Sequence, residues 1–127
     1  MYVVSVQSHY DSAHALRSYQ GKCENLHGHR YVAEIALGTT ELNAGGLAFD
    51  FVVVKKHLRE LTDHLDHQNL NEMFPFTEIE PSAENQARYI YEQMKERLPE
   101  AMAGALMYTR VWETPTQWAQ YSERPVW

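Results

Sequence analysis

Hydrophobic and polar residues alternate with a period of two along several stretches of the chain, which is the spacing of a β-strand with one buried face. This spacing predicts four strands, at residues 2–9, 28–38, 105–113 and 118–121. The first alternates imperfectly, whereas the second places every other residue from His29 to Leu37 on one face. A turn at residues 114–116 separates the last two strands.

Between the second and third predicted strands, apolar residues recur every three or four positions, as they do in amphipathic helices. Asp50 is a suitable N-cap for a first helix that runs to about Leu65. Ser82 is a suitable N-cap for a second helix that ends near Leu98, because Pro99 cannot continue it. The expected buried stripes are Phe51, Val54, Leu58, Leu61 and Leu65 in the first helix and Ala87, Ile90, Met94 and Leu98 in the second.

The resulting element order is two strands, two helices and two strands, or ββααββ. This segregation predicts an α+β domain in which both helices cover one face of a four-stranded antiparallel sheet. With 127 residues and no repeat or linker, residues 1–127 are expected to form a single domain. The sheet would have exposed edges, which favour pairing between subunits.

Charge and composition narrow the class of partner. The formal charge of −6 argues against nucleic acid or an anionic membrane as the main partner. No apolar run is long enough to span a membrane, and the N-terminal residues lack the pattern of a signal peptide. The only cysteine, Cys23, cannot form an intrachain disulfide, so we expect a protein of the reducing cytoplasm.

Three histidines form a candidate metal site. His27 and His29 are two residues apart, so on a strand both imidazoles leave the same face and can bind one ion. His14 follows the first predicted strand and could supply a third nitrogen. Zinc sites with three protein ligands keep a position open for substrate or water and are typically catalytic. Iron and nickel also accept imidazole ligands, and such histidines can simply be solvated.

Cys23 lies four residues before His27 and has three possible roles. It could be a fourth metal ligand, a buried structural thiol, or a base. A divalent cation nearby would lower the pKa of the thiol, so that the thiolate could accept a proton near neutral pH. Tight ligation by Cys23 would instead close the site and make it structural. The residues alone leave these alternatives open.

Other polar residues are weaker candidates. Asp66 and His67 could form a proton relay, or simply a polar helix end. Glu113, at the end of a predicted strand, could accept hydrogen bonds from a guanine-like or pterin ring, although a lone strand-end glutamate is commonly solvated. Arg17 and Lys22 lie between His14 and Cys23, where they could bind substrate phosphates or be ordinary surface residues.

Taken in order, four motifs resemble the 6-pyruvoyl-tetrahydropterin synthase family. They are His14, Cys-x-x-x-His-Gly-His at 23–29, Leu-Asp-His at 65–67 and Trp-Glu-Thr at 112–114. The resemblance is strongest to a bacterial branch, the 6-carboxy-5,6,7,8-tetrahydropterin synthases of queuosine biosynthesis. It implies the T-fold, in which trimers join their sheets into a barrel and two trimers stack into a homohexamer with active sites between subunits.

The resemblance also implies a role for each residue. It makes His14, His27 and His29 the zinc ligands, Cys23 the catalytic base, Asp66 and His67 the proton relay, and Glu113 the pterin anchor. Ser82 stands where the family usually has threonine in a Pro-Thr-x-Glu motif that contacts the pterin. The implied substrate is 7,8-dihydroneopterin triphosphate, and the implied products are 6-carboxy-5,6,7,8-tetrahydropterin, acetaldehyde and triphosphate.

Glu24 complicates this assignment. The sequence also reads Glu-x-x-His-Gly-His from Glu24, which resembles a branch that cleaves dihydroneopterin to 6-hydroxymethyl-7,8-dihydropterin in a folate-synthesis bypass. Alternatively, Glu24 is a solvated loop carboxylate. Two further alternatives are 6-pyruvoyl-tetrahydropterin synthase activity and a non-catalytic zinc-binding assembly module in which Cys23 closes the site.

Overall fold

The structure is a computed structural model that describes residues 1–18, 21 and 25–126. The strands are β1 (Tyr2–His14), β2 (His27–Thr39), β3 (Gln68–Asn69), β4 (Leu106–Thr114) and β5 (Gln117–Tyr121). The helices are α1 (Phe51–Leu65), α2 (Ala83–Arg97) and the short α3 (Glu100–Ala103), with a turn of 3-10 helix, η2, at Leu70–Glu72. The predicted α+β class is confirmed.

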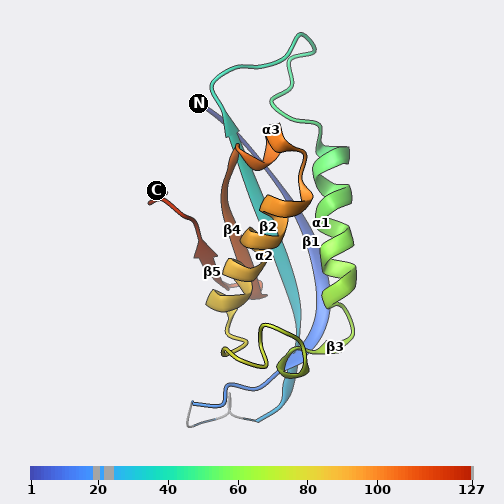
Figure 1. Cartoon of the computed structure of the whole chain (residues 1–127), viewed down its shortest axis with the longest axis vertical. Helices are drawn as coiled ribbons and strands as arrows, with labels where there is room; N and C mark the ends of the chain where they lie inside the picture. The colour runs from blue at the N-terminus through green and yellow to red at the C-terminus, as the bar shows by residue number, and fades with distance from the viewer. Residues whose placement is uncertain (19–20, 22–24, 127) are drawn as a thin grey trace.

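The sheet has the strand order β3-β1-β2-β4-β5 (Figure 1). The four predicted strands pair antiparallel, but β3 pairs parallel with β1, through Ser12 with Gln68 and Ala13 with Asn69. The prediction of a purely antiparallel, four-stranded sheet is therefore wrong, because the sheet is mixed and has five strands. A strand of two residues is too short to produce a detectable alternation.

β1 is longer than its pattern predicted, since it continues past residue 9 to His14. Tyr10, Ser12 and His14 are all buried on one face, so the alternation does continue. Because Ser12 and His14 are polar, the alternation of apolar and polar residues cannot be recognised there from the sequence. As a result, His14 is the last residue of β1 and pairs in register with His27, the first residue of β2.

Both long helices begin where their caps predicted. The side chain of Asp50 accepts a hydrogen bond from the backbone N–H of Val52 at 2.9 Å, and α1 starts at the next residue. The Ser82 hydroxyl accepts from the N–H of Asn85 at 3.1 Å and caps α2. The prediction that Phe51 belongs to the buried stripe of the first helix is wrong, because Phe51 is 50% exposed.

The helices α1 and α2 lie side by side over one face of the sheet (Figure 1). Between them and the sheet lies the core, which includes the fully buried side chains of Tyr10, Tyr31, Leu58 and Ile90. The opposite face of the sheet carries more exposed side chains. At the lower end in Figure 1, β1 ends, β2 begins and the chain enters α2, so these three segments meet there.

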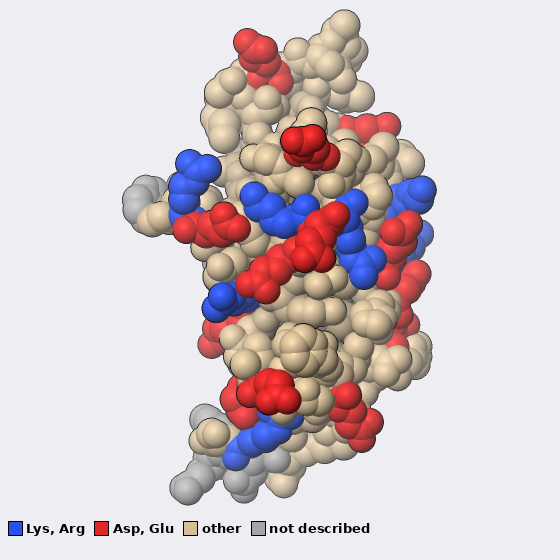
Figure 2. Space-filling view, in the orientation of Figure 1, with Lys and Arg blue, Asp and Glu red and all other residues tan. Residues whose placement is uncertain are grey.

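The helix-covered face is charged in a mixed pattern. Figure 2 shows Lys and Arg next to Asp and Glu over this face, rather than one large patch of a single sign. Within the described part of the chain, no helix combines the length and the apolar character needed to cross a bilayer.

Candidate metal centre

Three histidines meet at the lower end of the sheet. The antiparallel register places His14 opposite His27, and the period of β2 puts His29 on the same face as His27. Their ring centroids lie 4.6, 4.9 and 5.6 Å apart. With Glu113 of β4, they form a group whose possible ligand atoms all lie within 4.8 Å of one another. This group could hold a metal ion.

The hydrogen-bond partners of two of the rings fix their tautomers. Nδ1 of His14 lies 2.7 Å from the carbonyl oxygen of Pro81, and Nδ1 of His27 lies 2.6 Å from that of Asn25. A carbonyl oxygen only accepts hydrogen bonds, so each Nδ1 carries the proton and each neutral ring has its lone pair on Nε2. These two Nε2 atoms face each other at 3.0 Å. Because two lone pairs repel at this distance, the geometry suits a cation between them.

His29 completes the set of nitrogen atoms. Its Nε2 is buried and makes no hydrogen bond within the described residues, although Oε1 of Glu113 lies 3.2 Å away. Burial lowers the pKa of both His14 and His29, and this effect is only partly offset, for His14 by the Pro81 carbonyl and then Glu113, and for His29 by Glu113. Both imidazoles are therefore neutral at pH 7, which is the form that binds metals. Neutral imidazoles beside a carboxylate suit a divalent transition metal.

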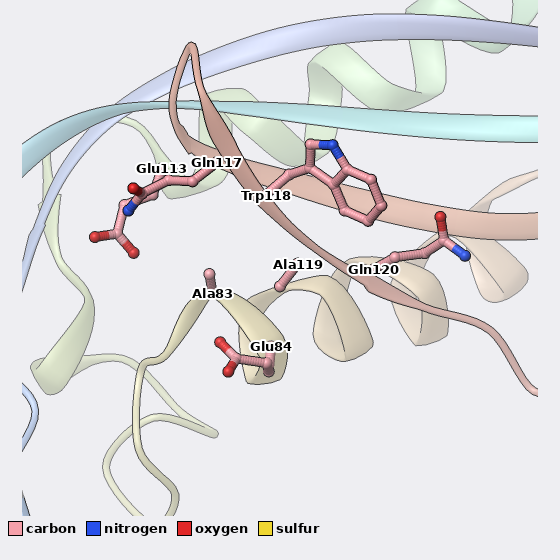
Figure 3. A pocket seen from close by; sticks show the side chains of 7 residues that line it. All are labelled: Ala83, Glu84, Glu113, Gln117, Trp118, Ala119 and Gln120. Atoms are coloured by element: carbon pink, nitrogen blue, oxygen red, sulfur yellow. The ribbon is translucent and has the colours of Figure 1, made fainter.

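Glu113 also lies in the wall of a pocket of about 400 Å³ (Figure 3), so this residue links the histidine cluster to the pocket. A second carboxylate, Glu84, comes from the first turn of α2. Ser82 directly precedes this wall, and its hydroxyl oxygen is engaged as the helix cap. The lining residues are Ala83, Glu84, Glu113, Gln117, Trp118, Ala119 and Gln120.

Asp66 and His67 form the expected pair, but the structure does not bring them into the histidine cluster of the same chain. Asp66 Oδ2 lies 2.8 Å from His67 Nδ1. The backbone of Asp11 holds both residues, because its N–H donates to Asp66 Oδ1 and its carbonyl accepts from the N–H of His67, each at 2.7 Å. The Asp11 N–H and His67 lower the pKa of the Asp66 carboxyl. The His67 side chain is 81% exposed at the outer edge of β1.

Arg17 is engaged by the loop that precedes α2. Its guanidinium donates to the carbonyl oxygens of Asn71, Phe76 and Ile79, and Nη1 lies 3.7 Å from the Glu80 carboxylate. The backbone N–H of Arg17 also donates to Glu80 Oε2 at 2.7 Å. Through these contacts, Arg17 connects the end of β1 to the loop that precedes α2.

Three predicted residues, Lys22, Cys23 and Glu24, lie outside the described residues. The next described residue after them is Asn25, whose carbonyl oxygen contacts His27.

Sequence reasoning missed two groups that orient the histidines. The carbonyl oxygens of Pro81 and Asn25 set the tautomers of His14 and His27, yet a backbone carbonyl leaves no mark in the sequence. It also did not foresee that Glu113 lies among the possible metal ligands. That position could have been found from the sheet, because Val111 and Glu113 alternate on the face that His29 and Tyr31 share once β4 pairs with β2.

Comparison with known proteins gives a consistent result. A sequence model of the family described as 6-pyruvoyl tetrahydropterin synthase matches residues 3–124. A protein from Aquifex aeolicus named 6-carboxy-5,6,7,8-tetrahydropterin synthase is 34% identical over 125 residues, covering 80% of this chain and 76% of that protein. A protein of the same name from Synechocystis sp. is 35% identical over 127 residues, covering 95% and 93%.

Solved structures show the same fold. The 6-pyruvoyl tetrahydropterin synthase of Caenorhabditis elegans has a TM-score of 0.80 at 26% identity, with 98% of each chain covered. That of Plasmodium falciparum has a TM-score of 0.72 at 24% identity, with 94% of this chain and 96% of that chain covered. The T-fold predicted from the sequence is thus the fold of this chain.

Proposed function

The chain belongs to the 6-pyruvoyl tetrahydropterin synthase family, and we propose that it is a zinc-dependent lyase that makes 6-carboxy-5,6,7,8-tetrahydropterin in queuosine biosynthesis. The substrate is 7,8-dihydroneopterin triphosphate; a water molecule is consumed, and acetaldehyde and triphosphate are released. Two relatives at 34% and 35% identity bear the name of this synthase. The single observation that carries the proposal is the convergence of three imidazoles beside a carboxylate and a pocket.

In this proposal, the Nε2 atoms of His14, His27 and His29 would hold the zinc ion. Two observations support this ligand set: the buried Nε2 of His29 makes no hydrogen bond to any described residue, and the lone pairs of the other two rings face each other. Bound zinc supplies Lewis-acid chemistry, which makes substrate hydroxyls more acidic. Three protein ligands leave a position for the substrate, as catalytic zinc sites require.

Cys23 and the Asp66–His67 pair handle the protons. The Cys23 thiolate removes a proton from the side chain of the substrate, and His67 returns one to the ring or to the leaving fragment. Oδ2 of Asp66 lies 2.8 Å from His67 Nδ1, so this carboxylate orients the imidazole. These roles come from the family motif, and the Asp66–His67 geometry is compatible with them.

Glu113 anchors the pterin ring. Its carboxylate can accept two hydrogen bonds, from a ring N–H and from the exocyclic amine of the pterin. A pocket of about 400 Å³ beside this carboxylate is in the size range of small-molecule sites. Ser82, which directly precedes the lining residue Ala83, contacts the ring through its hydroxyl or its backbone. Arg17 and Lys22 are the candidates for contacts with the substrate phosphates. For Arg17 this role competes with its present contacts, because its guanidinium already donates to three carbonyl oxygens.

The active assembly is a homohexamer, a dimer of trimers. β1 pairs with β3 only at Ser12 and Ala13, so most of its outer edge is open to another strand, and β5 is the other outermost strand of the sheet. The Asp66–His67 pair lies at that outer edge, where it could serve the histidine cluster of a neighbouring subunit. Native mass spectrometry at micromolar concentration should show the hexamer, and a spectrum of monomer alone would refute it.

Product identification tests the reaction. Zinc-loaded protein would be given 7,8-dihydroneopterin triphosphate and 7,8-dihydroneopterin in separate reactions, with metal-free protein as the control. We expect 6-carboxy-5,6,7,8-tetrahydropterin and acetaldehyde from the triphosphate alone. Formation of 6-hydroxymethyl-7,8-dihydropterin would instead support the folate bypass and a role for Glu24. Formation of 6-pyruvoyl-tetrahydropterin would support 6-pyruvoyl-tetrahydropterin synthase activity. Zinc binding without turnover of either substrate would favour the assembly module.

A further inference from the structure

We infer that Gln86 and Tyr10 are positioning residues for the metal ligand His14, and that they act through the carbonyl group of Pro81. This inference rests on the proposed metal site, because it assigns how one ligand of that site is held. Neither residue is among the possible metal ligands, and neither belongs to a motif of the sequence.

A chain of buried hydrogen bonds connects the three side chains. The Tyr10 hydroxyl donates to Gln86 Oε1 at 2.6 Å, and Gln86 Nε2 donates to the Pro81 carbonyl oxygen at 2.9 Å. The same oxygen accepts from Nδ1 of His14 at 2.7 Å. The exposed fractions of the three side chains are 0% for Tyr10, 2% for Gln86 and 2% for His14. Water therefore does not replace any of these partners.

The direction of each hydrogen bond is fixed by the chemistry of the groups. Pro81 offers only a carbonyl oxygen, so the Gln86 amide must present its NH₂ group to Pro81 and its oxygen to Tyr10. Tyr10 must then donate its proton. Burial, together with the neighbouring Tyr31, raises the pKa of Tyr10, so the hydroxyl remains protonated and is a permanent donor. The network has one consistent arrangement of protons.

This arrangement holds the Pro81 carbonyl in place for His14. Two donors on one carbonyl oxygen fix its direction more strictly than a single donor does. Gln86 lies in the first turns of α2, whose N-cap Ser82 directly follows Pro81, so the donor is mounted on a rigid element. With the carbonyl fixed, His14 keeps its proton on Nδ1 and directs the lone pair of Nε2 toward His27. Partners of this kind orient metal-binding histidines and raise their basicity.

The test uses two variants and a matched control in the full-length protein. Gln86→Met keeps the size of the side chain but removes both hydrogen bonds. Tyr10→Phe removes only the donor to Gln86 and retains the ring that stacks on Tyr31 with centroids 5.1 Å apart. The control, Thr109→Val, removes another buried hydrogen bond to the same helix, from the Thr109 hydroxyl to the Ala87 carbonyl at 2.5 Å, without touching Pro81.

Zinc affinity is measured by competition with a chromophoric chelator, and the tautomer of His14 by ¹⁵N chemical shifts in the metal-free protein. Gln86→Met should weaken zinc binding measurably, but by less than the about 10- to 100-fold that follows loss of a group bonded directly to a metal ligand, because Gln86 acts through the Pro81 carbonyl. It should also shift the His14 nitrogens toward a mixture of tautomers. Tyr10→Phe should change both readouts in the same direction to a smaller extent, and Thr109→Val should change neither.

Wild-type affinity and an unchanged His14 tautomer in Gln86→Met would overturn the inference. If that variant does not fold, the comparison of Tyr10→Phe with Thr109→Val decides, and equal zinc affinities would overturn it. Failure of the proposed function gives a different result: the wild-type protein would then not bind zinc through the three histidines. In that event, the His14 tautomer of the metal-free variants still tests the positioning role.

Discussion

Replacing one buried ligand should abolish the stabilisation of the fold by zinc. We choose His29→Gln, because His29 Nε2 is the buried ligand atom that makes no hydrogen bond in the described part of the chain. Glutamine keeps a polar group of similar reach but is a poor zinc ligand. His14 and His27 would remain beside Glu113, which the proposal assigns to the pterin, so the zinc ion would lose one of its three proposed protein ligands.

The size of the effect follows from mass action. A ligand that binds only the folded state stabilises it by RT ln(1 + [L]/Kd), which is about 2.7 kcal/mol at 100 times Kd. For a domain of this length, 1 kcal/mol shifts the midpoint of thermal unfolding by about 4 °C, so zinc should raise that midpoint by roughly 10 °C. Affinity of the unfolded chain for zinc, through Cys23 and the histidines, would reduce this value.

The assay is thermal unfolding, followed by circular dichroism, of the metal-free protein with and without zinc. His29→Gln should lose nearly all of the shift. The matched control is His64→Gln, which removes an exposed histidine of α1 and should retain it. A zinc-dependent shift of wild-type size in His29→Gln would show that the ion binds elsewhere and would refute the assignment of the site.

Three further predictions concern the proposed base Cys23, the contacts of Arg17, and the dependence of stability on pH. Cys23→Ala should keep bound zinc and the fold but lose turnover, whereas loss of zinc in metal analysis would make Cys23 a ligand. Arg17→Ala should lower the free energy of unfolding in urea by about 1–3 kcal/mol, because three carbonyl oxygens lose a charged donor; an effect only on KM for the triphosphate, with unchanged stability, would favour phosphate binding instead. The pKa values of His14 and His29 are lowered from 6.5 by burial, so the unfolded chain binds more protons than the folded chain below that pH. The metal-free protein should therefore lose stability as the pH falls from about 7 to about 5. In His14→Gln this loss should be smaller, and an equal loss would assign the effect to other groups.

Local signals made the helices predictable from the sequence. In α1 and α2, the caps Asp50 and Ser82 and the apolar stripes depend on residues a few positions apart, and the observed helices begin as expected. The end of β1 was not predictable in this way. Ser12 and His14 are polar but buried, because the hydroxyl of Ser12 donates to the Leu65 carbonyl and His14 binds Pro81. These partners come from distant parts of the chain.

The same distinction, between local signals and contacts with distant parts of the chain, applies to the candidate site. His27 and His29 could be paired from their spacing alone, because both lie on one strand. His14 could only be suggested, since its place depends on the register between β1 and β2. Gln86 could not be found at all, because its role depends on the position of the Pro81 carbonyl in the folded chain. Spacing within an element is readable from sequence, whereas contacts between elements are not.

The histidine cluster and the Asp66–His67 pair, the two halves of the proposed site, both contact β1. The alternation of this strand explains why they lie apart. Its even-numbered residues face the helices and end with His14 in the metal cluster. The backbone of Asp11, between Tyr10 and Ser12, instead points along the sheet and holds Asp66 and His67 at the outer edge. His67 has a φ of 56°, a left-handed conformation that costs a non-glycine residue energy, and it is retained here by these hydrogen bonds. Strand β1 therefore positions the proposed ligand His14 on one face and the proposed proton relay at its edge. A relay at an open sheet edge can act on a metal site only if another subunit lies against that edge, so the chemistry we propose and the oligomer we propose require each other.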